Sequence, residues 1–148
     1  MSSGYPRRFG AYVLLQRLGV GGMSEVDLAR RASDPDEYVR LVVLKRIKAE
    51  RHEDASFVRM FRDEARITSQ LHHQNIAQLF DFGRVGDEYF LALEYIPGVD
   101  LREVLNAVHQ RSEPLPIRVT LTVVSHVLAA LHYAHSRVDN VGRSMNIV

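Results

Sequence analysis

Residues 18–30, LGVGGMSEVDLAR, place three glycines within four positions. Glycine lets a main chain come close to another group, but it costs conformational entropy, so such a cluster needs a reason. Successive backbone N–H groups in a glycine-rich loop can hold phosphate oxygens. A tight turn would use the same residues, so the cluster alone leaves a phosphate loop and a structural turn both open.

A lysine and a glutamate form the second candidate. Residues 39–47, VRLVVLKRI, are rich in β-branched and aliphatic side chains and predict a strand, with Lys45 in an otherwise apolar row. Residues 56–71 show helical apolar spacing, and Glu64 completes that apolar stripe. Because a buried charge is costly alone, we predict that the helix packs on the sheet with Lys45 and Glu64 in contact as a buried pair. The alternative is that each side chain reaches solvent independently.

Two architectures compete for the glycine loop. In a dinucleotide-binding unit, residues 19–24 would end a buried parallel strand and residues 24–32 would form the following helix. Gln16 and Arg17 argue against this, because a parallel strand buried on both faces should be apolar. The acidic ribose contact expected about 20 residues further on is replaced by Lys45. A phosphate-loop NTPase is disfavoured because no Gly-Lys-Ser/Thr follows the glycines.

In the second architecture, antiparallel strands flank the loop, which then forms a flap over a nucleotide. A lysine of the next strand reaches the phosphates, and a glutamate on a helix orients that lysine. Lys45 and Glu64 fill these two roles, and neither has an explanation in the dinucleotide arrangement. The residues therefore favour the flap.

The composition limits the partners. The chain has 148 residues, of which 46% are hydrophobic and 25% charged, which is typical of one soluble globular domain. A net charge of +1 gives no general attraction to nucleic acid, so no nucleic-acid partner is expected. The absence of cysteine excludes a disulfide framework and a thiolate zinc site. His132 and His135 lie three residues apart on a predicted helix with no nearby carboxylate in sequence to complete a metal set, so no metal site is expected.

Two stretches bear on location. The N-terminus has no apolar signal region, and the apolar residues 119–134 are interrupted by Ser125, His126 and His132. We therefore expect no membrane segment and a cytoplasmic location.

Five motifs, in order, resemble the N-terminal part of the bacterial, eukaryotic-like serine/threonine protein kinases over about residues 9–148. GVGGMSEVDLAR is similar to the glycine-rich loop, VVLK to the strand with the nucleotide lysine, and FRDEAR to the helix with its glutamate partner. HHQNIAQLFDFG and YFLALEYIPGVDL are similar to the fourth strand and to the fifth strand with its hinge.

The resemblance implies an α+β fold. We expect a tail at residues 1–8 and an ATP-binding lobe at residues 9–96, with a five-stranded antiparallel sheet and one packed helix. The hinge and two helices of an incomplete helical lobe would occupy residues 97–148. By periodicity alone, residues 25–31 are ambiguous between strand and helix.

The resemblance also implies roles in phosphate binding. Gly19 and Gly21 would shape a flap whose amides cover the ATP phosphates, and Val26 would roof the adenine. Lys45 would hold the α- and β-phosphates and would itself be held by Glu64.

Further contacts to the adenosine are implied in the same way. Leu93 would lie at the back of the adenine pocket, and the main chain of Glu94 and Ile96 would bond the adenine edge. Asp100 would approach the ribose, although it also suits a helix N-cap, and both roles are compatible. The remaining expected contacts are Leu18, Val20, Gly22 and Val43.

Four positions depart from the family pattern. Ser24 stands where a third glycine is usual, and Val43 stands where alanine is usual above the adenine. Asp27 falls where an aromatic residue is common, and Thr68 falls in a row that is normally apolar. These departures bear on nucleotide affinity, because none removes a charged group that phosphate binding needs.

The sequence stops at residues 146–148, NIV, just where the family continues into the His-Arg-Asp catalytic loop and then the Asp-Phe-Gly metal ligand. The Mg²⁺ ligands are therefore expected beyond Val148, and transfer to a protein substrate is expected only in the complete enzyme. The chain alone is expected to be inactive. The alternative is a non-catalytic kinase-like module that binds nucleotide or a protein and self-associates through its exposed apolar helix at residues 117–136.

Overall fold

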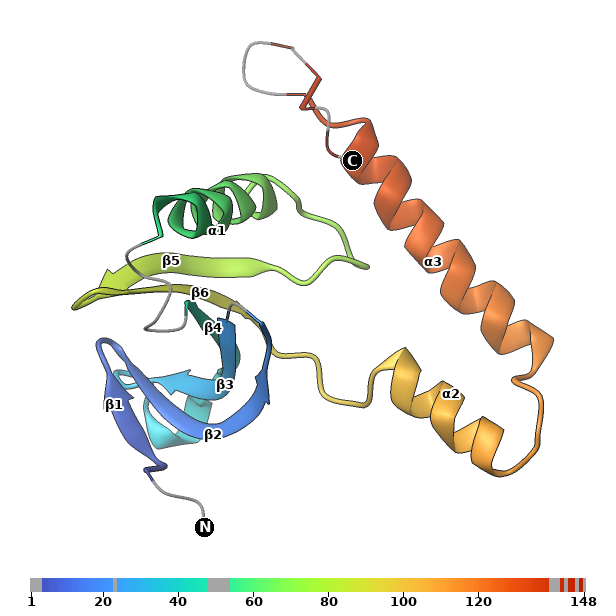
Figure 1. The fold of residues 1–148 in the computed structure, drawn as a ribbon, viewed down its shortest axis with the longest axis horizontal. Coiled ribbons are helices and arrows are strands. Elements are labelled where there is room, and N and C mark those ends of the chain that lie inside the picture. The colour runs from blue at the N-terminus through green and yellow to red at the C-terminus, as the bar shows by residue number, and fades with distance from the viewer. Residues whose placement is uncertain are drawn as a thin grey trace. The chain divides into compact units, whose positions relative to one another are not determined.

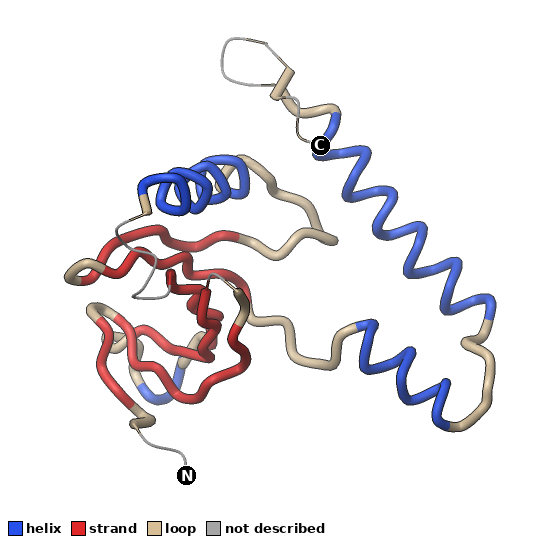
Figure 2. Tube along the Cα trace, in the orientation of Figure 1, coloured by secondary structure: helices blue, strands red, loops and turns tan. Residues whose placement is uncertain are grey.

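A computed structural model describes residues 4–22, 24–47, 54–138, 142, 144, 145 and 147. The chain forms two units, one of residues 1–72 and 77–95 and the other of residues 73–76 and 96–148. Figure 2 shows that the strands lie in the first unit.

The first unit is a curled antiparallel sheet with one helix against it (Figure 1). The strand order is β1-β2-β3-β4-β6-β5. The elements are β1 (Arg7–Phe9), β2 (Tyr12–Val20), β3 (Ser24–Arg31), β4 (Leu41–Ile47), helix α1 (Ala55–Thr68), β5 (Leu79–Val85) and β6 (Glu88–Glu94), with a short 3₁₀ turn η1 (Asp36–Tyr38) before β4.

The α+β fold is confirmed, with two differences from the prediction, an additional strand and the start of β4. The sheet has six strands rather than five, because Arg7–Phe9 pairs with Tyr12–Leu14 and buries the Phe9 side chain in the core. Part of the predicted tail is therefore a strand. Residues 24–31 form a strand, so the helix of the dinucleotide architecture is wrong. Strand β4 begins at Leu41 rather than at residue 39.

Apolar side chains cover both faces of the sheet. One cluster lies under α1, where Phe61 and Ala65 pack against Ile47 of β4 and Leu91 of β6. The other fills the opposite face and consists of Phe9, Tyr12, Leu14, Ala29, Val42, Leu44, Phe90 and Ala92. Side chains of β4 thus reach both clusters, Ile47 the one under α1 and Val42 and Leu44 the other.

The second face also buries a charged residue of β4. Arg46 is only 2% exposed, and its guanidinium lies 5.2 Å from the centre of the Phe9 ring. Its Nη1 donates to Glu88 Oε2 at 2.6 Å, and its Nη2 donates to Glu25 Oε2 at 2.8 Å. Its Nε donates to Asp27 Oδ2 at 2.9 Å. One guanidinium therefore connects β4 to β3 and to β6.

Asp27 is the fully buried partner in this network. It accepts hydrogen bonds from the Tyr5 hydroxyl, from Arg17 Nε at 2.7 Å and from Arg46. Burial by itself would raise the pKa of Asp27, but these hydrogen bonds outweigh it and hold the pKa below its ordinary value. Position 27, where an aromatic residue is common in the family, thus holds a carboxylate that accepts hydrogen bonds from three donors.

The second unit contains α2 (Leu101–Gln110) and α3 (Ile117–His135). The Asp100 side chain accepts from the Glu103 N–H at 2.8 Å and caps α2, as the sequence predicts. The His73 ring lies 5.1 Å from the Tyr133 ring of α3, tilted by 31°, and Asn75 Nδ2 donates to the His126 carbonyl at 3.1 Å.

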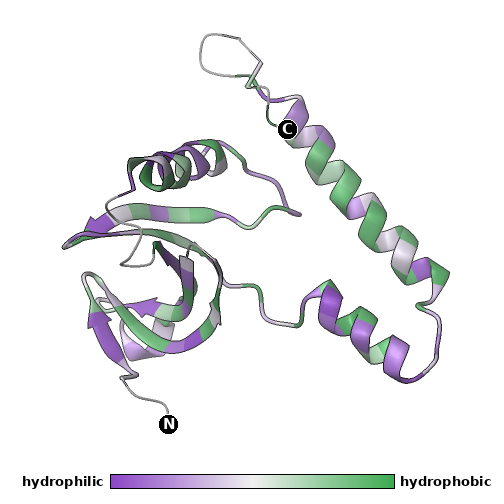
Figure 3. Ribbon diagram, viewed as in Figure 1, coloured by the Kyte–Doolittle hydropathy of each residue, from purple (hydrophilic) through white to green (hydrophobic). Residues whose placement is uncertain are grey.

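Helix α3 is apolar along most of its length (Figure 3). Its mean hydropathy over eighteen residues is 1.3, so by length and composition alone it could cross a membrane, although we expected no such segment. Its exposed apolar side chains are Ile117, Val119, Leu121, Val124, Val127, Leu128 and Leu131.

The buried carboxylate predicts an acid-sensitive fold. The lowered pKa of Asp27 means that its stabilisation is complete above about pH 4, the unfolded value, and is lost as the pH falls through the folded pKa. Asp27→Asn should lower the free energy of unfolding by about 3 kcal/mol near neutral pH. The free energy of unfolding of this variant should then decrease less than that of wild type as the pH falls. Urea melts between about pH 7 and about pH 3 measure both effects.

Asp36→Asn is the matched control, because the Asp36 side chain is 94% exposed and its ion pair with Arg30 is long, at 3.7 Å. It should leave the free energy of unfolding within about 0.5 kcal/mol of wild type. Identical acid profiles for Asp27→Asn and wild type would contradict this account of Asp27.

Candidate functional site

One row of backbone partners crosses four strands at the base of the glycine loop. Gly19 pairs with Val26, Val26 with Lys45, and Lys45 with Leu91. Directly paired residues of antiparallel strands project to the same face. Val26, Lys45 and Leu91 therefore share the face that carries α1.

A second row lies two residues further along the strands. Val43 pairs with Leu28 on one side and with Leu93 on the other. Because side chains alternate along a strand, Val43 and Lys45 project to the same face. The structure thus brings Val26, Val43, Lys45 and Leu93 together on one face, as half-buried side chains beside the glycine loop.

Lys45 contacts Glu64 of α1, and this confirms the predicted contact. Lys45 Nζ donates to both carboxylate oxygens of Glu64, at 2.7 Å and 2.8 Å. The predicted burial is wrong, because the side chains are 30% and 41% exposed. Phe61 and Ala65 occupy the buried stripe of α1, and Glu64 lies at its edge. The ammonium is therefore fixed in place while part of Lys45 remains open to a ligand.

The glycine loop contains no glycine that the fold requires. The Gly21 N–H donates to the Ser24 carbonyl at 2.8 Å and closes the connection between β2 and β3. None of Gly19, Gly21 and Gly22 has a positive φ. Among the described residues, an added Cβ at Gly19 or Gly22 would meet nothing within 4 Å, and at Gly21 only ordinary contact with Ser24 at 3.6 Å. A structural turn therefore does not explain these glycines. The remaining explanation is that a group outside the chain approaches the backbone closely.

The other residues predicted to contact a nucleotide lie beside the glycines, at the end of β6 and in the second unit. Leu18 and Val20 flank the glycines on β2 and are 43% and 59% exposed. The Glu94 main-chain N–H already donates to the Gln78 carbonyl at 2.8 Å. Ile96 and Asp100 belong to the second unit, so their roles toward a nucleotide stay predictions.

Sequence reasoning missed the charged network behind this face. Arg46 follows Lys45 directly, and strand alternation had to send it to the opposite face. Asp27 follows Val26 in the same way, which was the available signal that the two could pair.

Comparison with known proteins decides between the architectures. Residues 12–139 match the family model described as the protein kinase domain. The chain belongs to the protein kinase family. The match includes α3, so the apolar character of α3 is that of a helix within this domain.

Similar proteins include bacterial kinases. The tyrosine-protein kinase MasK of Myxococcus xanthus is 35% identical over 140 residues, covering 95% of this chain and 22% of MasK. The serine/threonine-protein kinase PrkC of Bacillus subtilis is 32% identical over 126 residues, covering 85% of this chain and 18% of PrkC. The chain thus spans about a fifth of the length of the curated relatives it matches.

A solved structure agrees in fold. The Mycobacterium tuberculosis PknI kinase domain superposes with a TM-score of 0.70 at 27% identity, covering 90% of this chain and 52% of that domain. The curled sheet and its helix are therefore those of a protein kinase.

The geometry of the glycine loop predicts contrasting stability effects. Gly21→Val should change the free energy of unfolding by no more than about 0.5 kcal/mol, because the loop offers space and needs no positive φ. Gly86→Val should cost about 1–2 kcal/mol, because Gly86 adopts a φ of +59° in the turn between β5 and β6. Urea denaturation measures both variants. A larger loss for Gly21→Val than for Gly86→Val would show that the glycine loop is a structural turn.

Proposed function

We propose that this chain is the ATP-binding portion of a serine/threonine protein kinase. The observation that carries the proposal is the bidentate Lys45–Glu64 pair beside the glycine loop. A lysine held by a carboxylate, next to backbone amides without side chains, supplies the charge and the donors that phosphate oxygens need. The apolar surface of Val26, Val43 and Leu93 on the same face suits an adenine ring.

Each element then has a defined task. The amides of residues 19–22 donate to phosphate oxygens, with Leu18 and Val20 beside the loop, and Lys45 holds the α- and β-phosphates while Glu64 fixes its position. The main chain of Glu94 and Ile96 bonds the adenine edge, and Asp100 approaches the ribose.

Mg²⁺ bound to ATP neutralises negative charge on its phosphates. We propose that the Mg²⁺ ligands lie beyond Val148, where the kinase resemblance puts the catalytic-loop asparagine and the Asp-Phe-Gly aspartate.

Phosphate transfer needs parts that these residues do not supply. No catalytic base motif is present in the 148 residues, so we propose that the chain by itself binds nucleotide without transferring phosphate. In a polypeptide that contains the catalytic loop, the γ-phosphate passes to serine or threonine of a protein substrate. PrkC and the PknB proteins, which are named serine/threonine kinases, support this class. We place the protein in the cytoplasm, where ATP is abundant.

Two specific observations favour other readings. MasK, named a tyrosine-protein kinase, is 35% identical to the chain and makes tyrosine the second candidate acceptor. The exposed apolar side chains of α3 favour a non-catalytic module that self-associates, with exposures such as 61% for Leu121 and 59% for Leu128.

Nucleotide binding should stabilise the fold through Lys45. Mg-ATP at about a hundred times its Kd should add roughly 2.7 kcal/mol to the free energy of unfolding and raise the Tm, whereas NADPH should have no effect. Lys45→Met should abolish the shift. Because the Lys45–Glu64 pair is partly exposed, the variant should lose only about 1 kcal/mol of stability without ligand.

Arg30→Met serves as the control, since Arg30 also has a surface ion pair, with Asp36 at 3.7 Å. Its Mg-ATP shift should equal that of wild type. An equal shift in Lys45→Met would remove Lys45 from the nucleotide site.

The acceptor class is tested by phosphoamino-acid analysis. Radiolabelled γ-phosphate from ATP should appear as phosphoserine and phosphothreonine in a protein substrate when the natural polypeptide contains the catalytic loop. The 148-residue chain should give no label. Label only on tyrosine would make tyrosine the acceptor. Label transferred by the 148-residue chain would contradict the proposal that this chain by itself does not transfer phosphate.

A further inference from the structure

Tyr5 precedes β1 and places its hydroxyl against the hairpin of β2 and β3, which carries the glycine loop. Its ring packs against the buried cluster on the second face of the sheet. The hydroxyl donates to Asp27 Oδ1 on β3 and accepts from Arg17 Nε on β2 at 3.0 Å. Burial and the bond to Asp27 both raise the pKa of Tyr5, so the hydroxyl keeps its proton near neutral pH. A residue from outside the hairpin therefore joins its two strands.

This contact lies at the base of the glycine loop. Arg17 and Asp27 are direct partners across the two strands, and the next pair toward the loop is Gly19 with Val26. The register shifts between these two pairs. Such an irregularity interrupts the regular ladder of backbone hydrogen bonds and bends the strand. Side chains at the base therefore contribute more to the position of the loop than they would in a regular hairpin.

Side chains from both strands and from Tyr5 close this base. Arg17 Nε lies 2.7 Å from Asp27 Oδ1, and Arg17 Nη2 lies 3.0 Å from Glu25 Oε2. Asp27 is fully buried, so open solvent does not replace a donor that is removed there. Among the described residues, Tyr5→Phe would leave Asp27 Oδ1 with Arg17 as its single donor.

The same base is connected to the strand that carries the nucleotide lysine. Asp27 Oδ2 accepts from Arg46 Nε at 2.9 Å, and Arg46 follows Lys45 in β4. Val26, which precedes Asp27, pairs directly with Lys45. Tyr5 thus bonds one oxygen of a carboxylate whose other oxygen holds the lysine strand. From the second face of the sheet, the hydroxyl fixes the glycine loop relative to Lys45.

We propose that Tyr5 is a positioning residue that holds the glycine loop in place for the phosphates of ATP. The inference rests on the proposed nucleotide-binding function. A loop that is fixed before binding loses less conformational entropy when it closes on a ligand. Without the hydroxyl, the loop should adopt more arrangements, and the affinity for phosphates should fall. The affinity for adenine should remain, because Val43 and Leu93 on β4 and β6 supply apolar surface away from this hairpin.

Calorimetric titrations of wild type and Tyr5→Phe with Mg-ATP and with adenosine test this role. Tyr5→Phe should raise the Kd for Mg-ATP about fivefold, a change of the size that one lost hydrogen bond can cause. The Kd for adenosine should change less than about twofold, because adenosine has no phosphate for the loop to bind. Without nucleotide, the Gly21 amide, which donates to Ser24, should exchange with solvent about threefold faster in the variant.

Tyr12→Phe is the matched control. The Tyr12 hydroxyl also donates to a carboxylate, that of Asp81 at 2.8 Å, but Tyr12 pairs with Arg31 at the opposite end of the β2–β3 hairpin. This variant removes the same atom, and it should bind both ligands and exchange at Gly21 as wild type does. Circular dichroism confirms that each variant is folded.

An equal loss of Mg-ATP affinity in Tyr5→Phe and Tyr12→Phe, or an equal loss for Mg-ATP and adenosine in Tyr5→Phe, would show a general effect on the fold and overturn the inference. An unchanged Kd for Mg-ATP in Tyr5→Phe would also overturn it and leave the proposed function intact. Unchanged exchange at Gly21 would overturn the claim that Tyr5 holds the loop. No binding of Mg-ATP by wild type would instead overturn the proposed function, and this inference with it.

Discussion

Two adjacent cations on one strand impose the central constraint on the sheet. Lys45 and Arg46 follow each other in β4, and the pleat sends them to opposite faces. Each needs carboxylates, because a charge that is taken from water without a partner is costly. Glu64 of α1 supplies one on the first face, and Asp27 heads the set on the second. The buried Arg46 network joins the neighbouring strands, and the partly exposed Lys45–Glu64 pair adds to the apolar packing of Phe61 and Ala65 that holds α1 on the first face.

The two faces of the sheet have different roles. On the second face, Arg46 and Arg17 connect β2, β3, β4 and β6 through Asp27 and its neighbouring carboxylates. This network lies directly behind Val26 and Lys45, and so it fixes the glycine-loop hairpin against the strand that carries the lysine. The first face therefore presents Lys45, apolar side chains and bare backbone in one arrangement. A phosphate chain attached to an aromatic base matches that combination.

The sequence predicts part of this arrangement on physical grounds. The cost of isolated charge in apolar surroundings was enough to pair Lys45 with Glu64, although it could not show how much solvent the pair retains. Residues 24–31 alternate too irregularly to distinguish strand from helix, since their buried Asp27 looks like a surface residue until Arg46 is brought beside it. Strand β1 was missed because its three residues are too few to show a strand period, although Gly10, with a φ of +55°, lies in the two-residue turn between β1 and β2.

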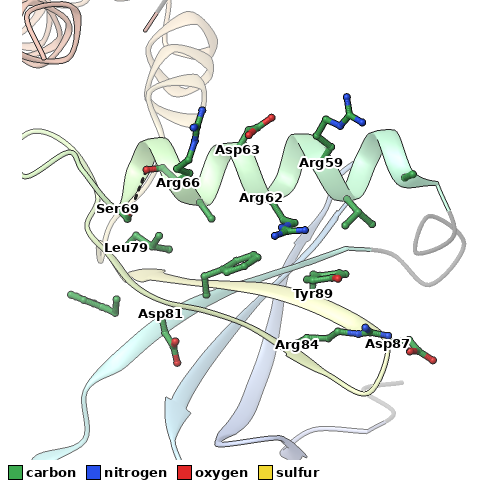
Figure 4. Close-up of a pocket in the computed structure, with 15 residues that line it drawn as sticks. Arg59, Arg62, Asp63, Arg66, Ser69, Leu79, Asp81, Arg84, Asp87 and Tyr89 are labelled. Carbon is green, nitrogen blue, oxygen red and sulfur yellow. Dashed lines mark hydrogen bonds and ion pairs between the residues drawn. The ribbon is translucent and has the colours of Figure 1, made fainter. Parts of the chain in front are cut away.

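The most direct test of the nucleotide site is a titration of the isotopically labelled chain with Mg-ATP, followed by proton–nitrogen correlation spectra. The account predicts that the backbone amide signals of residues 19–22, Val26 and Lys45 shift together and saturate with one Kd. Signals of Arg59, Arg62 and Arg84, which line a groove between α1 and the β5–β6 hairpin (Figure 4), should not move. Shifts confined to that groove, or no saturable shift at the glycine loop, would contradict the central claim that this face of the sheet binds ATP.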